Sequence, residues 1–578
     1  MLKKHQDRYP QEPPQLPQYD ISPDLKKLVI LFIGIMLANF IIAGVCALGM
    51  RIIQLGVPLS DQLHSAPQNI LFYALLTSHG QAMFFGVMSM NTVWFGYYAT
   101  SKWGRKPLSS MRWAKISLGV MEAGVILIFI SPVSSLGVGW YNLMPLIFLP
   151  GQPSITWTGT AAQIFLLADL LVGIGITIFC VIIVTTLLSG KIPVGTQFFA
   201  SRHGERAAKK ENEDYPQQDL DHTHMAYLPS AVRWMALLGF NSWFTKKLRD
   251  TTPAVPILLV AAFVTAMVQL IGNPGLFFQL TQGFVSLQQS STSIALDSTN
   301  WLLTKNAWWF FGHPIVYFPL LIFLGAMYYL TPRYARERVQ YNKWNYRPWP
   351  FYFMFSILVF SHHVFMDMPN PVWLQIMAQT ASLGIVFPSA LTIFTALLFI
   401  WRSQISWNIT TRFFLAGLAG WAFGGYQGAE MGMWGADIYL HNTMAMPSHI
   451  HLMLLLGPLL MTFGIIYAIF PDLTKKHMSK TLGECHFWLT LFGGFGFALL
   501  FNYIGMQGAI RREAEIPASF DWAMPWLLFF ALCIGITQLI FVYNVIRTLR
   551  RKPDSDELEE YNRLHLTPTG MDINEGGG

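Results

Sequence analysis

Six histidines in this chain lie inside or at the ends of long apolar segments, where hydrocarbon side chains are expected. They occur singly, as an adjacent pair and as a pair two residues apart: His79, His313, His362, His363, His449 and His451. One histidine in an apolar helix is ordinarily explained by a hydrogen bond to a neighbouring helix. Six of them favour metal binding, because neutral imidazole is the commonest metal ligand in proteins.

The spacing of His449 and His451 in PSHIHLM separates their functions. Residues two apart lie about 200° apart around an α-helix, so the two imidazoles face opposite ways. They cannot share one ion. Each is expected to bind a separate metal centre on either side of one helix, and an iron porphyrin is wide enough to fill the space between helices.

The adjacent pair His362 and His363 has a different geometry. Neighbouring residues lie only about 100° apart on a helix, so both rings can converge on one ion. His313, from another apolar segment, is the candidate third ligand. Three imidazoles with one open position suit copper, iron or zinc.

Tyr317 follows His313 by four residues, in FFGHPIVYF. Residues four apart share a helical face, so the phenol is expected beside whatever the metal binds. A tyrosine at that position can donate an electron and a proton. Without the histidines it would be interpreted as a packing residue.

The composition indicates what surrounds these residues. Only 12% of the 578 residues are charged, whereas 53% are hydrophobic and 15% aromatic. Soluble domains carry about 25% charged residues. The chain is therefore predicted to be a membrane protein.

Apolar stretches long enough to cross a bilayer, about 20 residues each, recur along the chain. They predict an all-α, polytopic membrane protein with about twelve transmembrane helices. The approximate spans are 28–50, 72–98, 115–135, 161–189, 253–274, 301–330, 350–366, 374–401, 412–432, 443–470, 486–506 and 524–547. All six histidines then fall in the outer third of the bilayer, a depth at which polar groups usually mark function.

The distribution of basic residues sets the orientation. All but four of the 38 Lys and Arg residues fall at the N-terminus or in even-numbered loops, and the exceptions are Arg51, Lys305, Arg511 and Arg512. Because short cytoplasmic loops collect basic residues, both termini are predicted to be cytoplasmic. The net charge of +7 reflects this topology, and no nucleic-acid partner is expected. His222 and His224, in DHTHM, are interpreted as residues of a solvated loop.

Three segments follow from this topology. They are a cytoplasmic N-terminal segment at 1–27, a twelve-helix catalytic domain at 28–547 that includes a polar cytoplasmic loop at 190–252, and a cytoplasmic C-terminal tail at 548–578.

Five short motifs, in order along the chain, resemble those of the large catalytic subunit of haem-copper oxygen reductases. They are TSHGQAMFF, WWFFGHPIVYF, FSHHVF, HNTMAMPSHIHL and AIRREAEIP. The resemblance implies two haems, of a or b type, and one copper ion. It makes His79 and His451 the axial ligands of a low-spin haem and His449 the ligand of a high-spin haem. It assigns the copper ligands to His313, His362 and His363.

The same resemblance assigns further roles. Tyr317 matches a tyrosine that the family cross-links to its copper-bound histidine. Arg511 and Arg512 match a pair that binds haem propionates, which explains their position on the outer side. Asp437 and His441 match polar groups near the propionates of the high-spin haem.

HPIVY carries Ile315 where the common mitochondrial-like type has a glutamate, and so resembles the B-type oxidases. The resemblance implies a single proton path from the cytoplasm, formed by Tyr328, Ser389, Thr392 and Thr395. Leu324 departs from the tyrosine often found in the middle of that path, where a water molecule is expected instead.

We interpret the chain as subunit I of a prokaryotic terminal oxidase in the inner or plasma membrane, reducing O2 to water with proton uptake and pumping. Expected partners are subunit II, other small subunits, membrane lipid, and cytochrome c, a cupredoxin or a quinol as electron donor. No pair of cysteines for a dinuclear copper centre occurs. A nitric oxide reductase is the alternative, and a proton-coupled transporter is the alternative of another class.

Overall fold

The computed structural model describes residues 19–56, 68–139, 157–195, 223–244, 254–289, 300–334, 343–367, 370–401 and 405–566. His222, the first 18 residues and the last 12 lie outside these ranges, as does the side chain of His224. The prediction of an all-helical membrane protein is confirmed. In the described ranges, ten helical segments are long and apolar enough to cross a membrane.

Helices occupy all twelve predicted spans. In chain order they are α1 Pro23–Gln54, α3 Gln68–Gln81 with η2 Ala82–Ser89 and α4 Met90–Gly104, α5 Met111–Ile128 with α6 Ser131–Ser134, α7 Gly159–Leu188, α11 Ile257–Gln289, α13 Trp301–Gly312 with α14 Pro314–Tyr334, α16 Pro348–Leu358 with η6 Val359–Val364, α17 Val372–Gly384 with α18 Val386–Trp401, α19 Ile409–Met431, α21 Ala445–Ile450 with η7 His451–Leu459 and α22 Leu460–Thr474, α23 Lys480–Met506 and α24 Met524–Arg550. The segments α16 with η6 and α19 are the two that do not meet the length and composition of a membrane span. The total of twelve crossings therefore stays a prediction.

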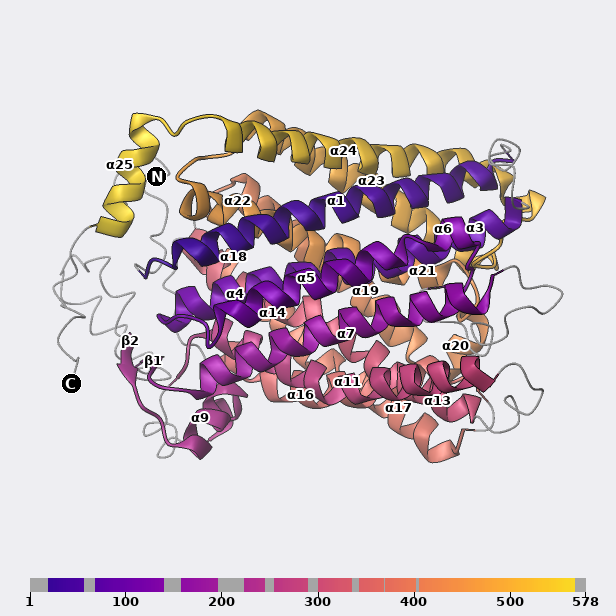
Figure 1. The fold of residues 1–578 in the computed structure, drawn as a ribbon, viewed down its shortest axis with the longest axis horizontal. Helices are drawn as coiled ribbons and strands as arrows, with labels where there is room; N and C mark the ends of the chain where they lie inside the picture. The colour runs from indigo at the N-terminus through magenta and orange to yellow at the C-terminus, as the bar shows by residue number, and fades with distance from the viewer. Residues whose placement is uncertain are drawn as a thin grey trace.

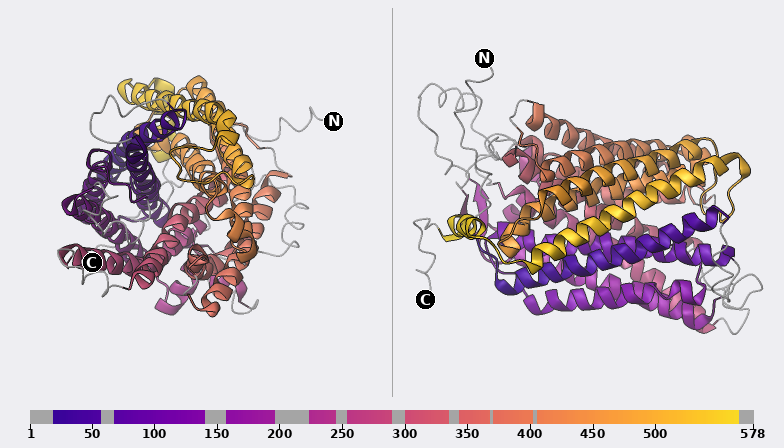
Figure 2. Two further views of the ribbon diagram at one scale, coloured as in Figure 1. Left: turned by 90° about the vertical axis from the view of Figure 1, so that its right-hand side faces the viewer. Right: turned by 90° about the horizontal axis from the view of Figure 1, so that it is seen from above.

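The long helices run side by side along one axis (Figure 1). Viewed from the end, the chain progresses around the bundle, and its last long helix, α24, returns beside its first, α1 (Figure 2). Of the ten candidate spans, those that contain α14 and α21 are the most buried inside the bundle. His79 lies on α3, Tyr317 on α14 and His449 on α21.

One end of the bundle carries α25 Ser555–Leu566 and the two-stranded sheet of β1 Ile192–Gly195 and β2 Thr223–Ala226 (Figure 1). The sheet and helix α9 Ser230–Leu237 fall in the polar loop predicted at 190–252, so this loop contains regular structure that its composition did not predict. Elements α3, α13 and α20 Trp434–Leu440 lie towards the other end (Figure 1).

Two predicted spans differ in detail from the structure. The span predicted to end at residue 274 continues as α11 to Gln289, with Pro274 inside the helix. Proline is tolerated in membrane helices, because neighbouring helices satisfy the backbone groups that it frees. The span predicted at 350–366 is instead an α-helix followed by the 3₁₀ segment η6, which contains both adjacent histidines.

The helices change type at the predicted axial histidines. The π-helical segment η2 begins three residues after His79, and the π-helical segment η7 begins at His451. Such segments are rare and often mark functional sites. Asn39 supports the first of them: its side-chain amide donates to the Gly86 carbonyl at 3.4 Å and to the Glu122 carboxyl at 2.9 Å.

Candidate functional site

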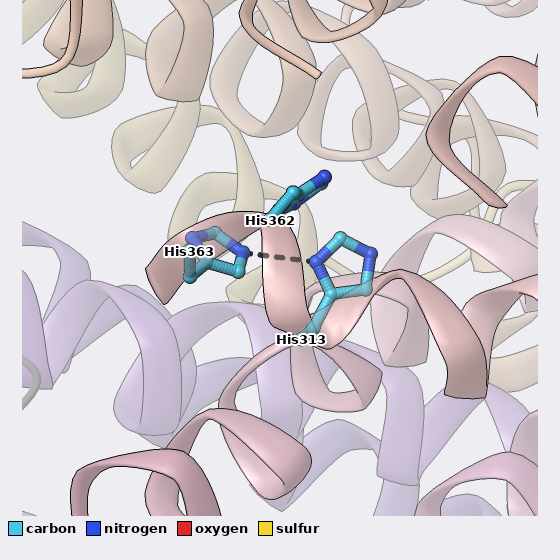
Figure 3. A group of neighbouring side chains, drawn as sticks. All are labelled: His313, His362 and His363. Atoms are coloured by element: carbon cyan, nitrogen blue, oxygen red, sulfur yellow. Dashed lines mark hydrogen bonds between the residues drawn. The ribbon is translucent and has the colours of Figure 1, made fainter. Parts of the chain in front are cut away.

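The structure brings His313, His362 and His363 together. His313 lies at the junction of α13 and α14, and the other two lie in η6. One ring nitrogen from each lies within 4.8 Å of the others, and in the described residues this is the one group of three His, Cys, Asp or Glu side chains so arranged. His313 Nδ1 and His363 Nε2 are 2.9 Å apart, and His362 lies beside them (Figure 3). The arrangement can bind a metal ion with three imidazoles.

Two neighbouring side chains orient this trio, and neither was predicted from the sequence. Trp309, four residues before His313, stacks on His363 with ring centroids 3.8 Å apart and planes 5° apart. The buried Ser382 hydroxyl lies 2.8 Å from His362 Nδ1 and donates its one proton to the Ala378 carbonyl at 2.7 Å. Ser382 must therefore accept from Nδ1–H of His362, which leaves Nε2 free as the metal-binding atom.

Tyr317 lies beside the trio, as its spacing predicted. Its ring centroid is 4.9 Å from that of His313, and the side chain is buried. His313 Nδ1 faces His363, whereas His313 Nε2 is buried and has no hydrogen-bond partner among the described residues. An unpaired nitrogen beside a phenol ring fits a covalent bond between the two residues.

One cavity joins these residues to His449. Its lining includes His313, Tyr317, His362, His363, Ser389, Asp437, His441 and His449. Nδ1 of His449 donates to the Gly424 carbonyl of α19 at 2.8 Å, so its Nε2 is the nitrogen free to bind a metal. A Cβ atom at Gly428 would lie 2.8 Å from His449 Cε1, so glycine leaves the imidazole room against α19.

His451 faces His79 instead, as the helical spacing predicted. The two rings are nearly parallel, with planes 13° apart and centroids 6.4 Å apart. Metal–imidazole bonds of about 2 Å on each side of one ion would separate the centroids by about 6 Å. Nδ1 of His79 donates to the Ala43 carbonyl and Nδ1 of His451 to the Pro447 carbonyl, so Nε2 of each ring is free for the metal. The pair fits an iron porphyrin with two axial histidines.

Arg51 was noted in the sequence only as a basic residue on the predicted outer side. In the structure its side chain is buried at the end of α1, and the guanidinium lies 5.3 Å from the centre of the Phe501 ring. Its Nη1 has no hydrogen-bond partner among the described residues. Arg51 therefore offers a donor beside the candidate low-spin haem.

Of the four residues predicted to lie near the haem propionates, two line the cavity. His441 Nδ1 donates to Asp437 Oδ2 at 3.1 Å, and both residues line the cavity. Arg511 and Arg512 are not among its lining residues. The backbone places them next to the cavity wall: the Arg511 N–H donates at 2.9 Å to the carbonyl of Asn442, the residue that follows His441.

The predicted proton-path residues are in contact. The Tyr328 hydroxyl lies 2.9 Å from Thr395 Oγ1, which donates to the Thr392 carbonyl at 3.1 Å. Ser389 lines the cavity that contains Tyr317. The sequence gave no reason to include Tyr352 of α16, whose hydroxyl lies 2.8 Å from Thr392 Oγ1.

Comparisons with known proteins identify the family of the chain. The family model "Cytochrome C and Quinol oxidase polypeptide I" matches residues 27–203 and 215–537. The chain is 28% identical to an alternative cytochrome c oxidase subunit 1 of Bradyrhizobium diazoefficiens, over 51% of this chain and 50% of that one. It is 23% identical to cytochrome c oxidase subunit 1 of Thermostichus vulcanus, over 93% and 86%.

Two further similarities bear on the donor and the fold. A probable quinol oxidase subunit 1 of Staphylococcus epidermidis is 25% identical over 89% of this chain and 68% of that one. A cryo-EM structure of a haem-copper terminal oxidase dimer superimposes with a TM-score of 0.64 at 19% identity, covering 92% of this chain and 85% of that one. With its fold, its histidine trio and a family match over most of its length, the chain belongs to the cytochrome c and quinol oxidase polypeptide I family and is a haem-copper oxidase subunit I.

Proposed function

We propose that this subunit reduces O2 to water between a high-spin haem bound by His449 and a copper ion bound by His313, His362 and His363. The observation that carries the proposal is the single cavity that these four histidines share with Tyr317. His79 and His451 would hold a low-spin haem that passes electrons to this centre. When bound, the haems and the copper supply electron transfer and the binding of O2.

The haem and the copper would supply all but one of the electrons needed to split O2. Tyr317 supplies that last electron, together with a proton from its phenol. A bond between its ring carbon and His313 Nε2 holds the ring beside the copper site. Forming that bond removes one hydrogen from each residue, with O2 as the oxidant. Two observations support this bond: Nε2 of His313 has no hydrogen-bond partner in the part of the chain that the structure describes, and the two ring centroids are 4.9 Å apart.

Protons for water formation travel along hydroxyl groups from Thr395 and Tyr328 through Thr392 to Ser389. Ile315 stands where the mitochondrial-like type has its glutamate, so this path is the route that the chain's own residues support, and the enzyme is of the B type. The haem propionates would be bound by Arg511 and Arg512, and Asp437 and His441 would lie near those of the high-spin haem.

The subunit works in the plasma membrane of a prokaryote with both termini in the cytoplasm. Protons drawn from the cytoplasm to an outer-third centre cross most of the membrane field, and each charge moved stores about 2.3 kcal/mol per 100 mV. Catalysis therefore conserves energy, and pumping adds to it.

The partners are subunit II and other small oxidase subunits, with cytochrome c, a cupredoxin or a quinol as the electron donor. The relatives include both donor classes. None of the relatives described above is a nitric oxide reductase or a transporter. O2 consumption by the purified oxidase, measured with quinol and with reduced cytochrome c, tests the function and identifies the donor. Absence of O2 uptake with either donor from a preparation that contains both haems would contradict it.

A further inference from the structure

The proton path has a gap on α14. Tyr317 and Tyr328 are eleven residues apart, about 16 Å along a helix. Leu324 lies between them on the same helical face, fully buried, and has no hydrogen-bonding group. Side chains of α14 alone therefore cannot carry a proton from Tyr328 to the cavity.

A hydroxyl from a different helix lies in this gap. Tyr352 of α16 is fully buried, and its hydroxyl lies 2.8 Å from Thr392 Oγ1. Ser389 lies one helical turn from Thr392 on α18 and lines the cavity. Thr395, one turn from Thr392 in the other direction, donates to the Thr392 carbonyl at 3.1 Å, and its Oγ1 lies 2.9 Å from the Tyr328 hydroxyl. The two tyrosines therefore contact neighbouring hydroxyls of α18.

We propose that Tyr352 carries protons between Thr392 and Ser389, supplying from α16 the phenol that Leu324 does not supply from α14. The proposal rests on the proposed function. Each hydroxyl in the series has one proton to donate and lone pairs to accept, so a proton can enter at Thr395 and Tyr328 and leave at Ser389 with every bond reversed. No oxidant or reductant is needed for this step.

Because Tyr352 approaches from α16, the path residues of α18 can all lie on one face of that helix. Ser389, Thr392 and Thr395 are spaced three residues apart and turn a single stripe of hydroxyls inward. Tyr328 contacts this stripe at Thr395, and Tyr352 contacts it at Thr392, one turn nearer the cavity. The path is therefore shared by three helices.

The test compares Tyr352→Phe with Tyr97→Phe in the purified, fully loaded oxidase. Tyr97 is a matched control, because it is equally buried and its hydroxyl pairs with one hydroxyl, that of Ser117, at 2.9 Å, on helices α4 and α5. Fully reduced enzyme is mixed with O2, and proton uptake from the medium is followed with a pH-sensitive dye. Haem spectra check that each variant is intact.

We expect Tyr352→Phe to slow proton uptake by about fivefold, since water can bridge part of the gap left by one hydroxyl. The deficit should grow as the pH rises, and Tyr97→Phe should match the wild type. Thr392→Val is measured alongside as the reference for the path itself.

The outcomes separate this inference from the proposed path. Slow uptake in Thr392→Val with wild-type uptake in Tyr352→Phe would overturn the role of Tyr352 and leave the path intact. Wild-type uptake in both variants would overturn both. Equal slowing in Tyr352→Phe and Tyr97→Phe would show a general effect of losing a buried hydroxyl and would also overturn the inference.

Discussion

The proposed copper site and the proposed proton path differ in how they are built. The trio His313, His362 and His363 comes from two short motifs, and a single residue type supplies every ligand. The proposed proton path instead joins Tyr328 and Tyr352, from two helices, to three hydroxyls of α18. A metal centre requires fixed atoms at fixed distances, whereas a hydroxyl chain requires only that each member reach the next.

This difference predicts which positions of the two sites tolerate substitution. Each imidazole of the trio must reach the metal from its own helix, so replacing one by alanine removes a ligand outright. In the path proposed above, a phenol from α16 takes the place of one at position 324, because proton transfer does not depend on which helix carries the hydroxyl. Variants of the copper site should therefore have large, all-or-none effects, and variants of the path should have graded ones.

Tyr317→Phe should have the largest effect on turnover. The variant loses the phenolic electron and proton while the fold keeps the ring, so both haem spectra should remain. We expect O2 reduction to fall at least about a hundredfold, the scale of losing a positioned acid–base group. In the native chain, a peptide digest should contain residues 313 and 317 in a species two hydrogens short. Near-native turnover would disprove the donor role, and an unmodified native peptide would exclude the cross-link alone.

His449→Ala and His451→Ala should differ sharply in their spectra, although the residues are two apart. His451 faces His79 and His449 faces the copper-site cavity. We expect His451→Ala to remove the low-spin bands and His449→Ala to abolish carbon monoxide binding to haem while low-spin bands persist. Identical losses in two stably folded variants would contradict two separate haem sites.

Ser382→Ala tests whether the hydrogen bond to His362 sets the ligand atom. Removing the acceptor frees the imidazole to change tautomer, and such partners typically contribute about 10- to 100-fold in metal affinity. Copper affinity, measured by titration against a chelator, should fall within that range. Ser361→Ala is the matched control, because Ser361 is buried next to His362 and its hydroxyl bonds to the Leu374 carbonyl instead. Equal affinity in the two variants would reject the proposed positioning role.

Thr392→Val should have the smallest effect, because it interrupts a path that water can partly bridge. Steady turnover should fall about fivefold, with unchanged haem spectra and a larger deficit at higher pH. Oxygen uptake at several pH values measures this. Turnover equal to wild type throughout that range would show that the path does not require Thr392.

The sequence predicted the parts of this molecule whose chemistry depends on residue type and short spacing. The opposite faces of His449 and His451, the convergence of His362 with His363, and the proximity of Tyr317 to His313 all follow from helical geometry. Tyr352 and Ser382 could not be predicted, since tyrosine and serine are common in helices and their partners are distant in the chain.

The remaining differences have similar causes. Arg51 was assigned only to a side of the membrane, because its burial depends on how α1 packs against Phe501. The continuation of α11 through Pro274 depends on neighbouring helices that a single segment does not contain. The burial of Arg51 and the length of α11 therefore depend on packing between distant segments, which local sequence patterns do not predict.

The most direct test of the central claim is the metal content of the wild type and of His363→Ala. The account predicts two haem irons and one copper per wild-type chain. In His363→Ala it predicts both irons, with copper reduced to the level of an adventitious contaminant. Full copper occupancy in a folded His363→Ala protein, or a third iron in place of copper in the wild type, would contradict the assignment.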